Sequence, residues 1–357
     1  MNATNNSLQN QFDEASRDKG FYSNGVTPRI AGEAILMFLI LGGNLLVIAA
    51  YATDRRLRSG TYTLLVSLAF SDLLVGGVSI PLRIYGSAKG WKVSVRLITL
   101  YTTFDIFSGI ASNLHLMAIS LERFIAVSRP FYHQTLSLRP YVVGSMVSWS
   151  LASVVAALHP GNYLQNADQR FLKLRLLKIY TAALFALCFL GPLLIITVVN
   201  IGIFRIAKTL IQRIPLQHVT DRQRLQKQRK TAFTLILMTS CFLVAWFPFF
   251  VVNMLYLHYL ECLPSSLEDK FLLVEIVKWL HYSNSVVNPV IYAFRDAEMR
   301  RAFAWLLGQG LLGKLCKINQ VGCHLDNTPS NMTMVSLRHD MSSRNLKCKT
   351  PNQTLCS

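Results

Sequence analysis

Charged residues are scarce in this chain of 357 residues, and their scarcity excludes most classes of soluble protein. Asp, Glu, Lys and Arg together make up 15% of the sequence, whereas hydrophobic residues make up 52%. A soluble domain of this length carries more charge, so the composition predicts a membrane protein. The formal net charge is +18, but the basic residues form short clusters between apolar runs, and no zinc-knuckle, RNA-binding or basic-zipper pattern occurs. We therefore expect no nucleic-acid partner.

Cysteine and histidine are too scattered to indicate a disulfide framework or a metal centre. The seven cysteines fall in two apolar runs, one loop and the C-terminal tail, and His115, His159 and His281 share no metal-ligand spacing. Because neither a metal cluster nor an activated nucleophile is indicated, we predict no enzyme. The first 28 residues lack an apolar core followed by a small-residue cleavage site, so a cleavable signal peptide is not expected.

Seven apolar runs are each long enough to cross a bilayer. They cover approximately residues 31–53, 60–86, 95–128, 140–159, 176–206, 230–258 and 270–294. Basic clusters follow the first, third, fifth and seventh runs, which places those ends in the cytoplasm and the N-terminus outside the cell. The sequence thus predicts an all-α fold, a seven-transmembrane helix bundle that crosses the plasma membrane. No inverted repeat is visible, which argues against a transporter.

Composition divides the chain into three parts. Residues 1–29 form a polar extracellular segment, residues 30–310 form the seven-helix domain with a short eighth helix, and residues 311–357 form a Ser/Thr/Asn-rich tail that is expected to be disordered in the cytoplasm. Asn2 and Asn5 begin glycosylation sequons in the extracellular segment. Two further sequons lie in the tail, so the pattern alone does not discriminate and topology selects Asn2 and Asn5.

The eighth helix is predicted from the segment that follows the seventh run. Between Arg295 and Leu307, the side chains of Phe303, Leu306 and Leu307 share one side and arginines the other. Such a helix lies on the anionic cytoplasmic leaflet of the lipid bilayer. Cys316 follows closely and is a candidate for palmitoylation.

The third run carries an acid near one end and a base near the other. Asp105 and Arg123 are eighteen residues apart, which is five helical turns and ~27 Å along the axis, close to the thickness of the hydrocarbon core. Ionisable groups within a membrane usually face the bundle interior. The spacing therefore predicts a ligand-side carboxylate near the outer face and a switch arginine near the inner face.

A second set of polar residues falls near mid-depth of several runs. Its members are Asn44, Asp72, Ser112, Asn284, Ser285 and Asn288. A buried carboxylate among hydroxyls and amides suits a small cation or a proton, because oxygen ligands favour a hard ion. The same residues also suit a polar network that only holds helices together. The residues alone leave these two alternatives open.

Short motifs in the runs carry a family resemblance. They are Gly43–Val47 (GNLLV), Leu68–Asp72 (LAFSD), Ser120–Phe124 (SLERF), Trp149, Phe242–Pro248 (ending WFP) and Asn288–Tyr292 (NPVIY). In this order and spacing the chain resembles the rhodopsin-like G-protein-coupled receptors over about residues 30 to 310. The resemblance implies that Glu122, Arg123, Asn288, Pro289 and Tyr292 belong to a cytoplasmic switch that opens to a heterotrimeric G protein.

Within that family the chain is most similar to the biogenic-amine receptors. The resemblance implies an amine-pairing role for Asp105, and a carboxylate among aromatic faces suits a protonated amine because it adds cation–π attraction to the ion pair. The ligand-binding residues it implies are Asp105, Trp246, Phe249, Phe250, Asn253, Lys278, Trp279 and Tyr282. It further implies an allosteric sodium ion at Asp72, Ser112, Asn284, Ser285 and Asn288. Trp246 and Phe242 would relay binding to the sixth helix, and arrestin and a receptor kinase would act at the tail.

Several positions depart from the family pattern. The usual disulfide between the third helix and the second extracellular loop is missing, because Ile98 stands where the helix cysteine is expected and residues 160–175 contain none. Leu184, Phe185 and Cys188 stand where catecholamine receptors present serines, and Asn113 replaces an aliphatic residue. A catechol would therefore find no hydroxyl partners on the fifth helix.

Lys278 is the position most particular to this chain. It lies four residues before Tyr282, and hence on the same face of the seventh helix. The resemblance implies that this face is turned toward the third helix beside Asp105, so we predict an ion pair between Lys278 and Asp105 across the ligand site. Ligands that also carry an anionic group, such as amino-acid derivatives, would then be preferred to simple monoamines. In the alternative, Lys278 extends outward and pairs with Glu275. Retinal bound through Lys278 is a further alternative, although a photoreceptor would use the position of Tyr282.

Overall fold

The computed structural model describes residues 2–163, 170–213, 240–264 and 266–308. The chain divides into two compact units, Met1–Gly308 and Gln309–Ser357, and the described residues all belong to the first. Cys316 and the part of the sixth run before residue 240 lie outside the described residues, as do the side chains of Asn2 and Asn5.

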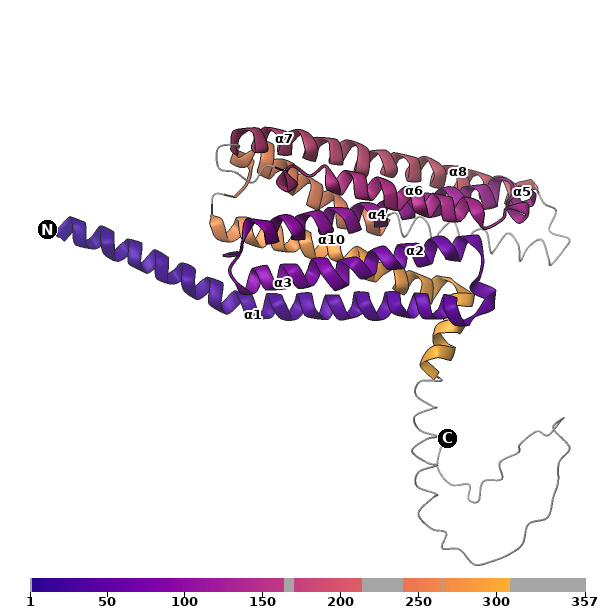
Figure 1. The fold of residues 1–357 in the computed structure, drawn as a ribbon, viewed down its shortest axis with the longest axis horizontal. Helices are drawn as coiled ribbons and strands as arrows, with labels where there is room; N and C mark the ends of the chain where they lie inside the picture. The colour runs from indigo at the N-terminus through magenta and orange to yellow at the C-terminus, as the bar shows by residue number, and fades with distance from the viewer. Residues whose placement is uncertain (1, 164–169, 214–239, 265, 309–357) are drawn as a thin grey trace, which may run out of the picture. The chain divides into compact units, whose positions relative to one another are not determined.

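The described residues are helical, and they contain no strand. In chain order the helices are α1 (Asn2–Thr53), α2 (Gly60–Leu74), α3 (Ile80–Ala88), α4 (Val95–Ser128), α5 (Pro130–Thr135), α6 (Arg139–Ala157), α7 (Arg170–Ala183), α8 (Gly191–Arg213), a helix that includes Ser240–His258, α10 (Leu267–Arg295) and a short helix over residues 297–308. The long helices run side by side (Figure 1). The all-α class expected from the sequence is confirmed.

Six stretches of the described residues are long and apolar enough to cross a membrane. They are Pro28–Thr53, Gly60–Ala88, Val95–Ser128, Arg139–Ala157, Phe171–Ile206 and Ser240–His258. The seventh long helix, α10, has 29 residues but is less apolar, because His281, Asn284 and Asn288 interrupt its apolar sequence. Those polar side chains are buried inside the bundle, where they add to the interior polar groups of the other helices.

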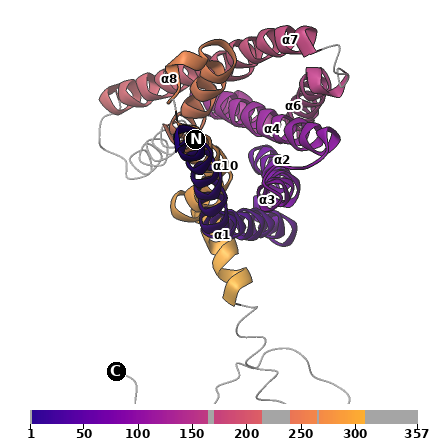
Figure 2. The same cartoon turned by 90° about the vertical axis from the view of Figure 1, so that its left-hand side faces the viewer.

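α4 occupies a central place in the bundle, since it packs against α2, α6 and α8, whereas α1 packs against α2 and α10. The view along the helices shows α4 running between these neighbours (Figure 2). Large apolar side chains such as Phe38, Leu187 and Val198 are exposed on the outer faces. In a membrane protein these faces meet lipid, so their exposure costs nothing.

Two helices are interrupted by π-helical segments just before a proline. Val75–Ser79 separates α2 from α3, which has Pro81 at its start, and Leu184–Leu190 separates α7 from α8, which has Pro192 at its start. Proline has no N–H to donate to the carbonyl four residues earlier, so the helix must bend or widen there.

Asparagine side chains from neighbouring helices donate hydrogen bonds to two backbone carbonyls that lack the usual donor in their own helix. Each of these carbonyls lies four residues before a proline, which has no N–H. The Asn113 amide donates to the carbonyl of Cys188, which is four residues before Pro192. The Asn44 amide donates to the carbonyl of Ser285, four residues before Pro289, at 3.1 Å. Asn113 therefore stands at a position usually held by an aliphatic residue because it satisfies a backbone group that α8 cannot.

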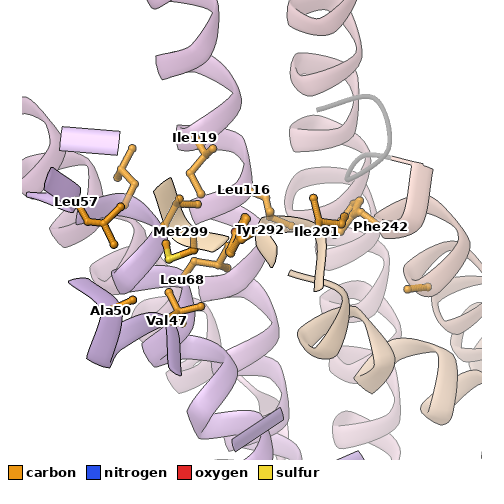
Figure 3. Close-up of a cluster of buried hydrophobic side chains, with 14 of the residues drawn as sticks. Val47, Ala50, Leu57, Leu68, Leu116, Ile119, Phe242, Ile291, Tyr292 and Met299 are labelled. Carbon is orange, nitrogen blue, oxygen red and sulfur yellow. The ribbon is translucent and has the colours of Figure 1, made fainter. Parts of the chain in front are cut away.

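Side chains of six helices meet in an apolar core at the end of the bundle where α10 ends. Figure 3 shows Val47 of α1, Leu68 of α2, Leu116 and Ile119 of α4, Phe242 of the sixth long helix, and Ile291 and Tyr292 of α10, together with Met299 of the helix over residues 297–308. Each of these side chains is at most 7% exposed. The short C-terminal helix thus contributes to the core of the bundle.

That short helix differs from the sequence expectation in where it begins. It begins after Asp296, whose carboxylate accepts hydrogen bonds from the backbone N–H groups of Glu298 and Met299 at 2.9 and 3.0 Å, so Arg295 belongs to α10. Its buried side is formed by Met299, Ala302 and Phe303, whereas Leu307 is 57% exposed. Phe303 and Leu307 are four residues apart and hence neighbours on the helix surface, so the apolar side expected to contain Phe303, Leu306 and Leu307 stays a prediction.

Candidate functional site

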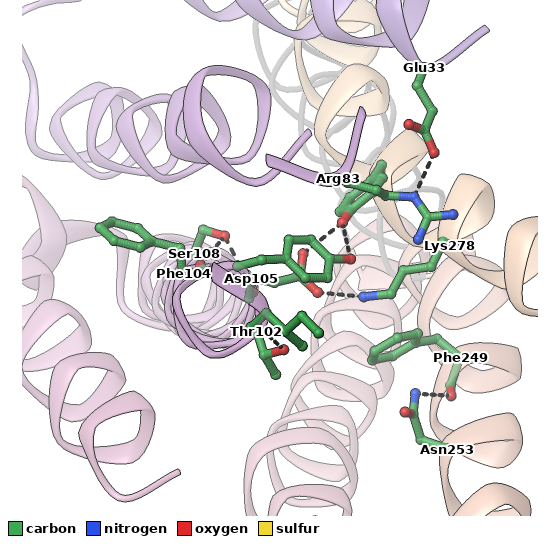
Figure 4. Close-up of polar contacts among 12 residues, drawn as sticks. Glu33, Arg83, Thr102, Phe104, Asp105, Ser108, Phe249, Asn253 and Lys278 are labelled. Atoms are coloured by element: carbon green, nitrogen blue, oxygen red, sulfur yellow. Dashed lines mark hydrogen bonds and ion pairs between the residues drawn. The ribbon is translucent and has the colours of Figure 1, made fainter. Parts of the chain in front are cut away.

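The carboxylate of Asp105, on α4, is held by two side chains of α10. Lys278 Nζ lies 2.5 Å from one carboxylate oxygen, and the Tyr282 hydroxyl donates to the other at 2.9 Å. The Tyr282 hydroxyl is also 3.0 Å from the hydroxyl of Tyr101. The predicted ion pair between Lys278 and Asp105 is confirmed, and the two groups point toward each other in Figure 4.

Three aromatic rings surround the Lys278 ammonium. Nζ lies 4.5 Å from the centroid of Phe249, 5.5 Å from that of Tyr101 and 5.6 Å from that of Tyr282. Each distance is within the range of a cation–π attraction. We call Asp105, Lys278, Tyr101, Tyr282 and Phe249 the Asp105 site. Its side chains form an ion pair enclosed by ring faces, which is the arrangement that stabilises a desolvated ammonium.

A second group of buried charges was not predicted from the sequence. Arg83 of α3 lies 2.5 Å from a carboxylate oxygen of Glu33 on α1 and 2.7 Å from one of Glu275 on α10. All three side chains are at most 8% exposed. Glu275 is thus engaged by Arg83, and the alternative in which Lys278 pairs with Glu275 is wrong for this structure. Figure 4 shows Glu33, Arg83 and Lys278 in one close-up of the same end of the bundle.

Below the Asp105 site lies an aromatic layer built around Trp246. Its ring centroid is 4.2 Å from that of His281 with the planes at 86°, and Phe249 stacks on His281 at 4.7 Å. Gly109 makes room for Trp246, because a Cβ at that position would lie 2.7 Å from Trp246 Cη2. Trp246 Nε1 and His281 Nδ1 are buried and have no hydrogen-bond partner among the described residues.

The remaining residues predicted to bind ligand lie around this layer. Phe250 stacks against Phe189 at 4.8 Å, toward the π-helical segment before α8. The Asn253 amide donates to the backbone carbonyl of Phe249 on its own helix at 2.8 Å (Figure 4). Trp279 packs against α1, where a Cβ on Gly32 would come 1.9 Å from Trp279 Cη2. The structure therefore brings Lys278, Tyr282 and Phe249 to Asp105, and places Asn253 and Trp279 away from it.

The mid-depth polar residues converge on Asp72 of α2. Ser112 donates to one carboxylate oxygen at 3.3 Å and Ser285 to the same oxygen at 2.8 Å, while the Asn288 amide donates to the other at 3.0 Å. Asn284 is also buried. Within the described residues no group of three His, Cys, Asp or Glu side chains could hold a metal ion. Asp72 is the one carboxylate of this network, and its hydroxyl partners are the oxygens that a small cation would use.

Near the C-terminal end of α4, Glu122 is the centre of a polar cluster. Its carboxylate lies 2.7 Å from Arg123 Nε, accepts a hydrogen bond from Thr61 at 2.7 Å, and lies 2.7 Å from His133 Nε2. Glu122 is 5% exposed, whereas the Arg123 side chain is 26% exposed. Arg123 is thus tied to a buried acid while part of it remains accessible, which suits a group that exchanges partners.

The predicted switch residues of α10 lie in its C-terminal half. Pro289 packs beside Gly43 of α1, whose absent Cβ would lie 3.1 Å from the proline ring. Tyr292 is 5% exposed, and its hydroxyl has no hydrogen-bond partner in the part of the chain that the structure describes. Most buried hydroxyls in folded proteins are hydrogen-bonded, so that of Tyr292 departs from the usual pattern.

Near the N-terminal end of α4, hydrogen bonds connect this helix to the segment after α6. Thr103 donates to the Asn162 side-chain oxygen at 2.9 Å, and the Asn162 amide donates to the carbonyls of Ala156 and Ala157 at 3.1 and 3.2 Å. Burial, together with nearby Lys173, lowers the pKa of His159 in this segment to about 4, so its imidazole is neutral at physiological pH. These contacts occupy the region in which the family disulfide is expected, and Cys262 is a free, exposed thiol.

Comparisons with known proteins agree with this architecture. Residues 43–292 match the family described as "7 transmembrane receptor (rhodopsin family)". The histamine H2 receptor of Cavia porcellus is 30% identical over 280 residues, which cover 75% of this chain and 76% of the relative. The histamine H2 receptor of Homo sapiens is 28% identical over 85% of this chain and 84% of its own length, and a D(5)-like dopamine receptor of Takifugu rubripes is 31% identical over 88% and 73%.

Proposed function

The chain belongs to the rhodopsin family of seven-transmembrane receptors, and from that premise we propose that it is a plasma-membrane receptor that binds a protonated amine at Asp105 and activates a heterotrimeric G protein. Relatives that are covered over most of their length are named for histamine and dopamine, which are small amines. Their names support an amine-bearing ligand for this chain.

One observation carries the proposal: the Asp105 site already holds a primary ammonium. Lys278 Nζ contacts the carboxylate at 2.5 Å, and the rings of Phe249, Tyr101 and Tyr282 surround it. A free amine has the same charge and the same donors as the lysine head group. The site is therefore sterically and electrostatically suited to an external ammonium once Lys278 has moved aside.

The contacts below this site supply a path to the sixth long helix. Phe249 lies between the Lys278 ammonium and His281, and His281 packs on Trp246. Trp246 is 5.6 Å from Phe242, which belongs to the cytoplasmic core. A ligand that displaces Lys278 would change the contacts of Phe249 and hence the position of this aromatic series, and the Arg123 contact to Glu122 would be the bond broken at the inner end.

Other parts of the proposal concern the N-terminal segment, the C-terminal tail and an allosteric sodium ion. An extracellular N-terminus would carry glycans on Asn2 and Asn5, and the tail would carry palmitate on Cys316 and engage arrestin and a receptor kinase. Asp72 would hold an allosteric sodium ion, with the hydroxyl oxygens of Ser112 and Ser285 as further ligands. The hydrogen bonds from those hydroxyls to Asp72 support this choice of ligands, because they place both oxygens beside the carboxylate.

The test is a second-messenger screen of cells that express the full chain, against a panel of amines and amino acids. We expect a dose-dependent response that falls at least about 30-fold in potency in Asp105→Asn, because removing one partner of a buried charge pair costs 2 kcal/mol or more. Asp269→Asn, at an exposed acid at the start of α10, is the matched control and should leave potency unchanged. Responses that survive Asp105→Asn at full potency would show that the amine does not bind at Asp105.

A further inference from the structure

The Asp105 site is occupied by the chain's own lysine. Lys278 is attached to α10, so it is always present beside Asp105, and the side chain is 12% exposed. A ligand with a single ammonium group must compete with this tethered cation for one carboxylate. An external monoamine is at a disadvantage in that competition, because a tethered group has a high effective concentration.

Displacing Lys278 also leaves a buried ammonium without its counter-ion. The two nearby carboxylates, of Glu33 and Glu275, are both engaged by Arg83 at 2.5 and 2.7 Å. Burial of an unpaired charge is strongly unfavourable. A monoamine therefore exchanges one ion pair for another and leaves an unpaired lysine behind, whereas a ligand that carries its own anion provides a new partner for Lys278.

The aromatic layer around Trp246 and His281 indicates which side chains would contact the part of the ligand beyond its ammonium group. Gly109 lies one helical turn inward from Asp105 on the same face of α4, and Trp246 fills the space beside it. Trp246 Nε1 and His281 Nδ1 are buried polar atoms at this level that have no hydrogen-bond partner among the described residues. An aromatic ring with a hydrogen-bonding atom would stack against these side chains and satisfy one of the two.

We propose that the ligand is a zwitterionic aromatic α-amino acid, with its ammonium on Asp105, its carboxylate on Lys278 and its ring against Trp246 and His281. This rests on the proposed function, because it places the ligand amine at Asp105. In an α-amino acid the two charged groups stand on one carbon atom, so Lys278 has to withdraw by only a few ångström. Its flexible four-carbon stem permits that movement without a shift of α10.

The experiment compares amino acids with the amines that differ from them only by loss of the carboxylate. The pairs are histidine and histamine, tyrosine and tyramine, and tryptophan and tryptamine, each applied to cells expressing the full chain. For at least one pair we expect wild type to prefer the amino acid by at least about tenfold in potency, the worth of one charge-assisted hydrogen bond. Lys278→Met, which keeps the length and removes the charge, should abolish that preference and raise potency for the amine.

Two controls separate this effect from misfolding. Lys278→Arg keeps the cation and should retain the preference for the amino acid, and Lys89→Met, at an exposed lysine of the outer loop, should behave as wild type. Surface expression of each variant is measured with an N-terminal tag. Equal potency of amine and amino acid in wild type, a preference that survives Lys278→Met, or no response to any of the three amino acids would overturn the inference.

The same data distinguish failure of the inference from failure of the proposed function. If the monoamines alone act and require Asp105, the amine receptor stands and the zwitterion is wrong. If amino acids act at full potency in Asp105→Asn, the assignment of the amine to Asp105 is wrong, and both proposals fall.

Discussion

Replacement of Arg83 by methionine should destabilise the bundle more than any substitution of an exposed arginine. The Arg83 guanidinium neutralises Glu33 and Glu275 at 2.5 and 2.7 Å, and no side chain of the three is more than 8% exposed. Methionine has a similar length but no charge, so Arg83→Met leaves two buried carboxylates without their cation. Breaking a buried ion pair in this way costs about 3–5 kcal/mol, since the remaining charge is uncompensated.

The assay is thermal unfolding of the purified, detergent-solubilised chain. In domains of 150–250 residues 1 kcal/mol shifts the unfolding midpoint by roughly 2–4 °C, so we expect Arg83→Met to lower it by at least ~6 °C. Arg96→Met, at an exposed arginine near the outer start of α4, is the matched control and should shift it by less than ~1 °C.

A double-mutant cycle shows whether the loss comes from the ion pairs. Glu33→Gln removes one of the two carboxylate charges, so the cost of Arg83→Met should be smaller in that background by at least ~1 kcal/mol. Equal costs in the two backgrounds, or a midpoint for Arg83→Met within error of wild type, would refute the reasoning that Arg83 holds α1 and α10 together by charge.

Four further predictions concern other parts of the chain. Arg123→Ala should abolish agonist-driven G-protein activation and leave surface expression largely intact, which a nucleotide-exchange assay and cell-surface labelling would measure; unchanged signalling would remove its switch role. Asp72→Asn should make agonist affinity independent of sodium concentration, whereas wild type should bind agonist more weakly as sodium rises; equal sodium dependence in both would leave Asp72 a structural group. Metabolic labelling with palmitate should mark wild type and not Cys316→Ser, and equal labelling would exclude that site. Asn162→Ala should lower the free energy of unfolding by about 1–3 kcal/mol through loss of the hydrogen bonds of Asn162. A reducing agent should not change the unfolding midpoint of wild type. A midpoint that falls on reduction would show that a disulfide contributes.

The sequence predicted those site contacts that depend on periodicity along one helix. Lys278 and Tyr282 are four residues apart, so both reach the same face of α10, and the ion pair of Lys278 with Asp105 followed from the resemblance that sets that face toward α4. The convergence of hydroxyls and an amide on Asp72 followed in the same way from residues at one depth of several runs.

Contacts that depend on the rotation of one helix against another were not predictable from the residues. Glu33 and Arg83 are both intramembrane charges, which is a signal that could have been used, but their pairing requires the relative heights and orientations of α1, α3 and α10. Trp279 packs against α1, a contact that the residues alone did not indicate, because one residue step rotates a side chain by about 100°.

The amides of Asn44 and Asn113 have a consequence for how fast the molecule changes shape. Each bonds to a carbonyl that a proline has freed on a neighbouring helix, at Ser285 and Cys188 respectively. If α10 or α8 slides past its neighbour, that carbonyl must lose its partner before it gains another, and an unsatisfied buried carbonyl costs about 1–3 kcal/mol. When both bonds are absent at the crossing point, the barrier rises by ~2–6 kcal/mol, which lengthens the lifetime of each conformation by roughly 30-fold to more than 10,000-fold. Two asparagines that are neutral in charge and lie outside the Asp105 site would thereby set how long a signal, once started, persists.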